Sequence, residues 1–183
     1  MPKIFINPGH SPDFNNGGDP GAVSPRTGLK EAEVALKVGT LVKQYLEAVG
    51  YEVYLLQSDS LGYICNESNN WDSDYFVSIH CNAAANYSAR GAETWVYAGS
   101  VKGRRLGDAI QKQIIDNIPI TDREIKIATP GINGLYVLTN TDCPAVLVEM
   151  GFITNEYDEK LLGDSHYQDE FARCIARGIS DVH

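Results

Sequence analysis

Apolar positions along this chain form short continuous runs separated by segments of helical spacing, a pattern that predicts alternating strands and helices. We predict strands at residues 3–7, 51–56, 75–80, 91–98, 135–138 and 145–149. We predict helices at residues 29–49, 63–70, 101–118, 155–162 and 166–182. Two of the strands, at 77–79 and 145–148, are apolar enough to be buried on both faces. The order of elements therefore predicts an α/β domain with a largely parallel sheet and helices on both sides.

Residues 11–28 interrupt this pattern with a long segment rich in glycine and proline. Long loops in compact domains are usually functional, so this segment is a candidate wall of a binding site. The 183-residue chain as a whole has 43% hydrophobic and 21% charged residues and contains no repeat or linker. We therefore predict one domain spanning residues 1–183.

Charge and hydropathy exclude several kinds of partner. The 15 Lys and Arg residues and the 24 Asp and Glu residues give a net charge of −9, which argues against nucleic-acid binding. The longest apolar stretches, such as 144–148, are too short to cross a membrane, and we expect no membrane insertion. No basic start followed by an apolar stretch marks a signal peptide, and nothing in the sequence indicates an oligomer, so we expect a monomer.

The cysteines show no metal-binding or redox spacing, and we expect them to be reduced. They are Cys65, Cys81, Cys143 and Cys174.

Two histidines follow predicted buried strands at their carboxyl ends. His10 ends the segment Asn-Pro-Gly-His, and His80 lies in Val-Ser-Ile-His-Cys-Asn. Ligands of α/β sheets gather beyond the carboxyl ends of the strands, so these imidazoles are a candidate pair of metal ligands. His166 and His183 are expected to be solvated or terminal.

A catalytic zinc ion often takes a carboxylate as its third protein ligand. The candidates are Glu31 and Glu33 at the start of the first helix and Glu149 at the end of the last strand. An acidic residue at a helix start is also common for electrostatic reasons, and spacing alone does not choose between Glu31 and Glu33. Glu149 follows a fully apolar run, where a carboxylate is costly unless a cation or hydrogen bonds compensate.

The sequence does not match other common catalytic or nucleotide-binding motifs. The glycines at 17–21 lack the Lys and Ser/Thr of a phosphate-binding loop and the spacing of a dinucleotide fingerprint. Cys81 is a poor nucleophile candidate, because neighbouring residues of a strand point to opposite faces and His80 could not easily serve as its base.

With these residues in place, the sequence resembles the zinc-dependent N-acetylmuramoyl-L-alanine amidases called amidase type 3. The similarity extends over nearly the whole chain, and its segments occur in order at family-like spacing. They are Asn7-Pro8-Gly9-His10, Gly18-Asp19-Pro20-Gly21-Ala22, Gly28-Leu29-Lys30-Glu31, Phe76 to Ala83, Gly91-Ala92-Glu93-Thr94, Leu135 to Leu138 and Pro144 to Asn155.

The resemblance implies a three-layer α/β/α domain around a mostly parallel six-stranded sheet. It implies that His10, Glu31 and His80 hold zinc and that Glu149 is the catalytic carboxylate. Glu31 is favoured over Glu33 because the family's ligand precedes the aligned leucine, here Leu36, by five positions. The implied reaction is hydrolysis of the amide between N-acetylmuramic acid and L-alanine in peptidoglycan, at the cell wall or outside the cell. The chain departs from the family after the second strand, where a usual threonine–arginine pair is replaced by residues 57–59.

Asn82 could orient substrate or cap its strand, and Glu93 could orient a ligand histidine or lie on the surface. A zinc peptidase acting on the stem peptide and a non-catalytic wall-binding or regulatory module are alternative functions. Because wall polymers are anionic, the acidic charge predicts either a separate wall-binding module in the native protein or reliance on the substrate groove alone.

Overall fold

The computed structural model describes residues 1–11 and 17–183, and in them one sheet is built from six strands. The elements are β1 (Lys3–Pro8), α1 (Glu31–Ala48), β2 (Glu52–Leu55), α2 (Leu61–Asn70), β3 (Tyr75–Asn82), β4 (Ala92–Tyr97), α3 (Val101–Asn117), β5 (Asp122–Ala128), α4 (Tyr136–Thr139), β6 (Ala145–Phe152), α5 (Glu156–Gly163) and α6 (Ser165–Ser180). The strand order is β2-β1-β3-β6-β4-β5. Only the β4–β6 pair is antiparallel among these described strands, so the sheet is mostly parallel as predicted.

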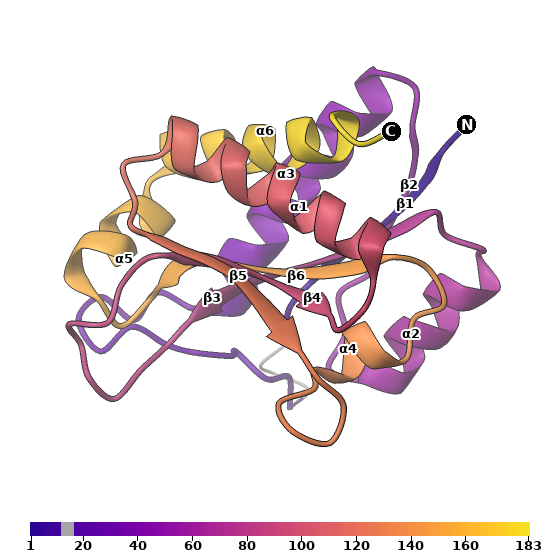
Figure 1. Cartoon of the computed structure of the whole chain (residues 1–183). Helices are drawn as coiled ribbons and strands as arrows, with labels where there is room; N and C mark the ends of the chain where they lie inside the picture. Colours follow the sequence, from indigo (N-terminus) through magenta and orange to yellow (C-terminus); the bar gives the residue numbers. More distant parts are fainter. Residues whose placement is uncertain (12–16) are drawn as a thin grey trace.

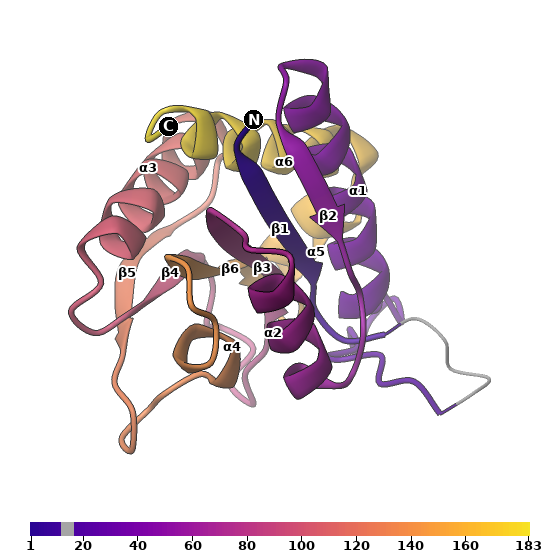
Figure 2. The same ribbon diagram turned by 90° about the vertical axis from the view of Figure 1, so that its right-hand side faces the viewer.

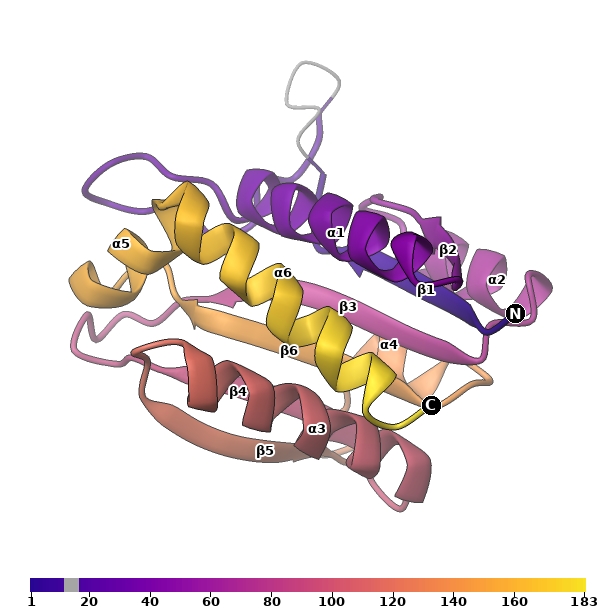
Figure 3. The ribbon, with the colours of Figure 1, turned by 90° about the horizontal axis from the view of Figure 1, so that it is seen from above.

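Helices cover both faces of the sheet, which confirms the predicted α/β/α arrangement (Figure 1). On one face α1, α6 and α3 lie side by side, as the view from above shows (Figure 3). Their apolar residues, such as Val38, Ile110 and Ile175, pack against Ile6 and Val77 of the central strands. The shorter α2 and α4 lie on the opposite face (Figure 2). Their buried apolar residues cluster with Phe5 and Phe76 of the sheet.

One predicted strand is a helix. The apolar run at residues 135–138 predicts a strand, but Tyr136–Thr139 form α4, in which the backbone N–H groups of Leu138 and Thr139 donate to Leu135 O. Val137 and Leu138 are buried against the sheet face. A run of four apolar residues satisfies either structure, and here packing onto the sheet replaces pairing within it.

The strand missing from the prediction is β5. It lies at the edge of the sheet, and four of its seven residues are charged. Edge strands commonly carry charges that discourage further pairing, and this removes the apolar run by which a strand is recognised. The adjacent irregularity in the pairing with β4, where Glu124 has φ 64°, weakens the alternation further.

The state of the cysteines and the length of the apolar stretches were also predicted from the sequence. All four cysteines lie in the described part of the chain and are free, as predicted. Across residues 1–11 and 17–183, no helix combines the length and apolarity needed to cross a membrane.

Candidate metal centre

Three of the candidate ligands meet at the carboxyl edge of the sheet. His10 follows β1, His80 lies near the end of β3, and Glu31 is the first residue of α1. One ligand atom of each lies within 4.8 Å of the others. Glu33, the alternative carboxylate, is instead exposed and pairs with Lys30 Nζ at 3.6 Å.

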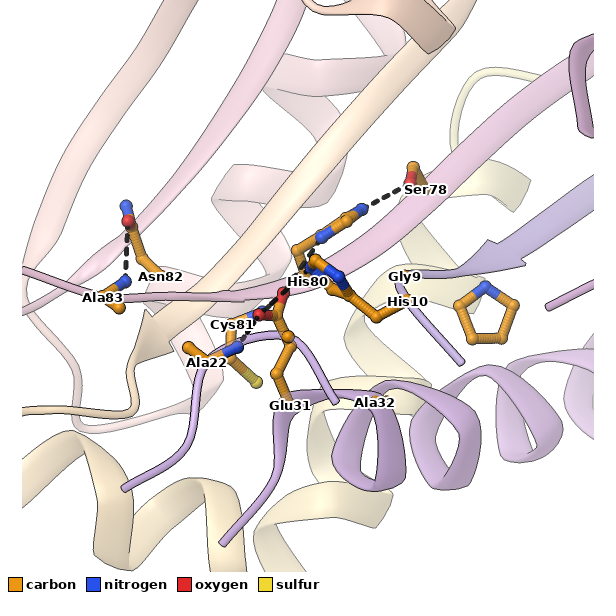
Figure 4. A network of polar contacts seen from close by, with 12 residues as sticks. Gly9, His10, Ala22, Glu31, Ala32, Ser78, His80, Cys81, Asn82 and Ala83 are labelled. Atoms are coloured by element: carbon orange, nitrogen blue, oxygen red, sulfur yellow. Dashed lines mark hydrogen bonds and ion pairs between the residues drawn. The ribbon is translucent and has the colours of Figure 1, made fainter. Parts of the chain in front are cut away.

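Glu31 lies at the centre of this group and is only 4% exposed. Its Oε1 lies 3.0 Å from His80 Nδ1, and its Oε2 lies 3.3 Å from His10 Nε2. The same oxygens accept hydrogen bonds from the backbone N–H groups of Cys81 (3.0 Å) and Ala22 (2.9 Å), contacts that surround the carboxylate in Figure 4. The carboxylate is therefore held from two sides by backbone donors and faces both imidazoles.

The loop before α1 explains why Glu31 reaches this position. A helix leaves its first backbone N–H groups without partners inside the helix. Here the N–H of Glu31 donates to Ala22 O at 2.9 Å, and that of Ala32 donates to Pro20 O at 3.0 Å. The segment 20–22 thereby binds the amino end of α1 and brings Glu31 beside the strand ends.

Proton affinities in the group reflect these contacts. Burial works to raise the pKa of Glu31, but the hydrogen bonds with His10 and His80 outweigh it and hold that pKa well below its usual range. The hydrogen bond to Glu31 in turn raises the pKa of His10 from 6.5 to about 9, against the opposing effect of burial. Without a metal ion the cluster therefore keeps a positive charge next to Glu31, in the place where a cation would compete with the proton.

Two glycines allow the ligands to approach so closely. A Cβ added at Gly9 would lie 2.3 Å from Cε1 of the His80 ring. At Gly21, where φ is +67°, a Cβ would lie 2.6 Å from both Glu31 Oε2 and His10 Cδ2. No other residue type fits at either position without moving a candidate ligand.

The second nitrogen of each imidazole also has a partner. His10 Nδ1 lies 2.9 Å from Asp19 Oδ2, an arrangement that directs Nε2 toward Glu31. His80 Nε2 lies 2.9 Å from Ser78 Oγ, which donates to Asn7 Oδ1 at 2.8 Å. Such partners fix the orientation and tautomer of ligating imidazoles.

Glu149 stands next to this group on β6. It is the register partner of His80, and its side chain is part-buried. Its buried Oε2 has no hydrogen-bond partner among the residues that the structure describes. Burial, with smaller contributions from Glu31 and Glu93, raises the pKa of Glu149 to about 7.

These residues fit a bound transition-metal ion. Two imidazole nitrogens and one carboxylate oxygen are the donor set of many catalytic zinc sites, which leave a position for water. The unpartnered oxygen of Glu149 at the same edge supplies an acceptor that a bound water could use.

Asn82 and Glu93 form a separate network beside Glu149. Glu93 is buried, and its carboxylate accepts hydrogen bonds from Asn82 Nδ2 (3.1 Å), Trp95 Nε1 (3.1 Å) and Arg123 Nε (2.7 Å). Asn82 Oδ1 also accepts from the backbone N–H of Ala83. The surface alternative for Glu93 is therefore wrong, and among the described residues Asp19 and Ser78 contact the second ring nitrogens of the two candidate ligand histidines.

The glycine-rich loop is only partly described, because residues 12–16 lie outside the described residues. Its end, residues 26–29, lines an open pocket of about 800 Å³ together with α5. The pocket lining includes Glu33 but none of the three candidate ligands, so this part of the loop lines a pocket other than the candidate metal centre.

The sequence interpretation missed the partners of the histidines. Asp19 was present in the Gly-Asp-Pro-Gly-Ala segment, but the loop around it gave no indication of where its side chain points. Ser78 was detectable, because residues two apart on a strand share a face and Ser78 precedes His80 by two.

Both the sequence and the structure of this chain match those of known proteins. A sequence model described as N-acetylmuramoyl-L-alanine amidase matches residues 4–181. The germination-specific N-acetylmuramoyl-L-alanine amidase of Bacillus subtilis is 29% identical, over 96% of this chain and 77% of that protein. The amidase LytC of B. subtilis is 34% identical, over 96% of this chain and 34% of that protein. The structure of the amidase AmiC2 of Nostoc punctiforme superposes with a TM-score of 0.88 and 30% identity, covering 98% of this chain and 96% of that one.

Proposed function

This chain belongs to the N-acetylmuramoyl-L-alanine amidase family, and we propose on that basis that it is a zinc-dependent enzyme which hydrolyses the amide between N-acetylmuramic acid and L-alanine in peptidoglycan. The observation that carries the proposal is the convergence of His10, Glu31 and His80 beside Glu149, whose Oε2 has no hydrogen-bond partner in residues 1–11 and 17–183. Family membership supports the amidase reaction, and the donor set supports zinc.

His10, Glu31 and His80 would hold the ion. A bound zinc ion supplies Lewis acidity, which polarises a carbonyl group and lowers the pKa of water. Two neutral imidazoles and one carboxylate leave the site with a net charge of +1, so the ligands preserve this acidity. Asp19 and Ser78 keep the two rings oriented toward Glu31.

Glu149 would move the protons of the reaction. Because Glu149 is the register partner of His80, its carboxylate would lie beside any water or substrate carbonyl that enters the centre. As general base Glu149 removes a proton from the attacking water, and as general acid it returns that proton to the leaving nitrogen of L-alanine. The unpartnered Oε2 supports this role, because a carboxylate fixed by several donors would be a weaker base.

We place the enzyme's action at the cell wall. The net charge of −9 gives the chain little electrostatic attraction to anionic wall polymers. The chain corresponds to about a third of LytC, whose remaining length offers room for other modules. We therefore propose that tight wall retention, where it occurs, depends on a module other than this one.

The test is hydrolysis of purified, dye-labelled peptidoglycan by the zinc-loaded protein, by the protein with chelator, and after zinc is added back. Product analysis should show new α-amino groups on L-alanine and free lactyl carboxyls on muramic acid. Release of D-alanine instead would identify a stem-peptide carboxypeptidase. Activity that survives complete removal of metal would contradict the zinc dependence.

A further inference from the structure

The segment that follows β2 contacts the backbone on both sides of the metal centre. The Nε2 of Gln57 donates to Gly9 O at 3.2 Å and to Ala32 O at 2.9 Å. Gly9 immediately precedes His10, and Ala32 immediately follows Glu31. One side-chain amide thus uses both of its hydrogens to join the chain segments that carry two of the proposed ligands.

Asp59, two residues further on, reaches the same centre by another route. Its Oδ2 accepts a hydrogen bond from the backbone N–H of Asp19 at 3.0 Å. The carboxylate of Asp19 contacts His10 Nδ1, and Asp19 O accepts from the backbone N–H of Ser11. Asp59 therefore fixes the residue that orients the His10 ring.

The backbone of His10 needs such support. Its φ is 60°, in the left-handed region that non-glycine residues rarely occupy. A residue in this region is strained and persists only where neighbouring contacts hold it. Gln57 binds the carbonyl just before His10, and Asp59 acts on the partner of its ring.

We propose that Gln57 and Asp59 are positioning residues of the metal centre, which hold His10 and Glu31 in ligating geometry before the ion binds. This inference rests on the proposed zinc site. It assigns a task to the segment in which the chain departs from the threonine–arginine pair usual in the amidases that it resembles. Preorganised ligands spend less binding free energy on ordering, so the gain is in metal affinity.

The first test substitutes Gln57→Leu, which removes both donors while keeping a side chain of similar size. We expect zinc affinity, measured by competition with a chromogenic chelator, to fall by about 10- to 100-fold. The control is Gln168→Leu, since part-buried Gln168 donates from Nε2 to Leu162 O between α5 and α6. The metal-free Tm should change by a similar amount in both variants, and only Gln57→Leu should lose part of the rise in Tm caused by zinc.

The second test uses Asp59, which is exposed and can be replaced without disturbing the core. Asp59→Ala should weaken zinc binding by about 10-fold, and Asp59→Asn, which keeps an acceptor oxygen, should restore it. A merely structural role would lower the metal-free Tm and leave the zinc affinity of the folded protein unchanged.

Two outcomes overturn the inference, and they are distinguishable. If the wild-type protein binds zinc and both Gln57→Leu and Asp59→Ala bind it equally well, only the positioning role fails. If the wild-type protein binds no zinc, the proposed zinc site and this inference both fail.

Discussion

Glu149 on β6 is the register partner of His80 on β3 and also of Glu93 on β4. Residues in register on neighbouring strands share a face of the sheet, so a candidate ligand, the candidate catalytic carboxylate and a hydrogen-bonded structural carboxylate lie in one row. Glu93 is held by Asn82, Trp95 and Arg123, whereas Glu149 Oε2 has no partner within the described residues. Two carboxylates thus lie side by side on the sheet, and among the described contacts Glu149 is the one that keeps an oxygen free for the proposed proton transfer.

This difference predicts the effect of Glu149→Gln. The amide has nearly the same shape but accepts no proton, so we expect turnover to fall by about 10²- to 10⁴-fold while zinc content and Tm stay close to wild type. Dye release and metal analysis of the same preparation measure both quantities. Glu33→Gln, a change at an exposed residue of α1, is the matched control and should leave dye release unchanged. Wild-type turnover in Glu149→Gln would exclude the proposed role.

Glu31→Ala should lose zinc, whereas Glu149→Gln should keep it. It removes the one carboxylate that faces both imidazoles, so we expect zinc to be absent from the purified protein and activity to be lost with it. Atomic spectroscopy of the dialysed protein gives the zinc content, with Glu33→Ala as the control that keeps the ion. A stoichiometric amount of zinc in Glu31→Ala would show that another residue supplies the third ligand.

The pattern of apolar residues predicts much of this architecture but not all of it. Strands β1, β3 and β6 are predictable because they are buried runs, and their shared direction brings His10, His80 and Glu149 to one edge. Edge strand β5 and helix α4 were not predictable, because their structure depends on what they pack against. Local pattern signals periodicity, whereas tertiary contacts decide between structures of equal periodicity.

The residues of the candidate metal centre were likewise only partly predictable from the sequence. The two candidate ligand histidines can be identified from the sequence because each follows an apolar strand. Gln57 and Asp19 act through contacts across 25 residues or more and across nine residues respectively, to backbone groups or a ring that no local pattern specifies. The contacts of such supporting residues can be identified only in the folded structure, where the positions of the loops are defined.

Gly9→Ala tests how tightly the ligands are packed. The added Cβ would lie 2.3 Å from His80 Cε1, so the ring or the loop carrying His10 must move. We expect zinc affinity to fall by about 10-fold or more, with a corresponding loss of dye release at limiting zinc. Gly62→Ala is the control, because a Cβ there meets only Tyr136 Oη at an ordinary 3.7 Å. Equal zinc affinity in the two variants would show that the site tolerates the displacement.

We expect the protonation of Glu159 to affect the free energy of unfolding at acidic pH. Glu159 is 5% exposed and accepts hydrogen bonds from Arg26 Nε (2.9 Å) and Thr27 Oγ1 (2.5 Å), which join the end of the glycine-rich loop to α5. Burial works to raise the pKa of Glu159, but hydrogen bonds from Ser24, Thr27 and Arg26 outweigh it and hold the pKa below its usual 4.5. A carboxylate whose pKa is depressed by folding stabilises the fold above the unfolded-state pKa, and this contribution is lost as pH falls through the folded-state pKa.

Glu159→Gln should therefore lower the free energy of unfolding by about 1–3 kcal/mol at pH 7. The difference from wild type should shrink below pH 4.5, because the wild-type carboxylate then takes up a proton and loses the same interactions. Denaturant unfolding of metal-free protein across this range measures the effect without interference from zinc release. Glu156→Gln on the same helix is the control, since the exposed pair of Glu156 with Lys160 should contribute little at any pH. A constant difference between Glu159→Gln and wild type from pH 7 to pH 3 would show that the ionised carboxylate of Glu159 is not what joins the loop to α5.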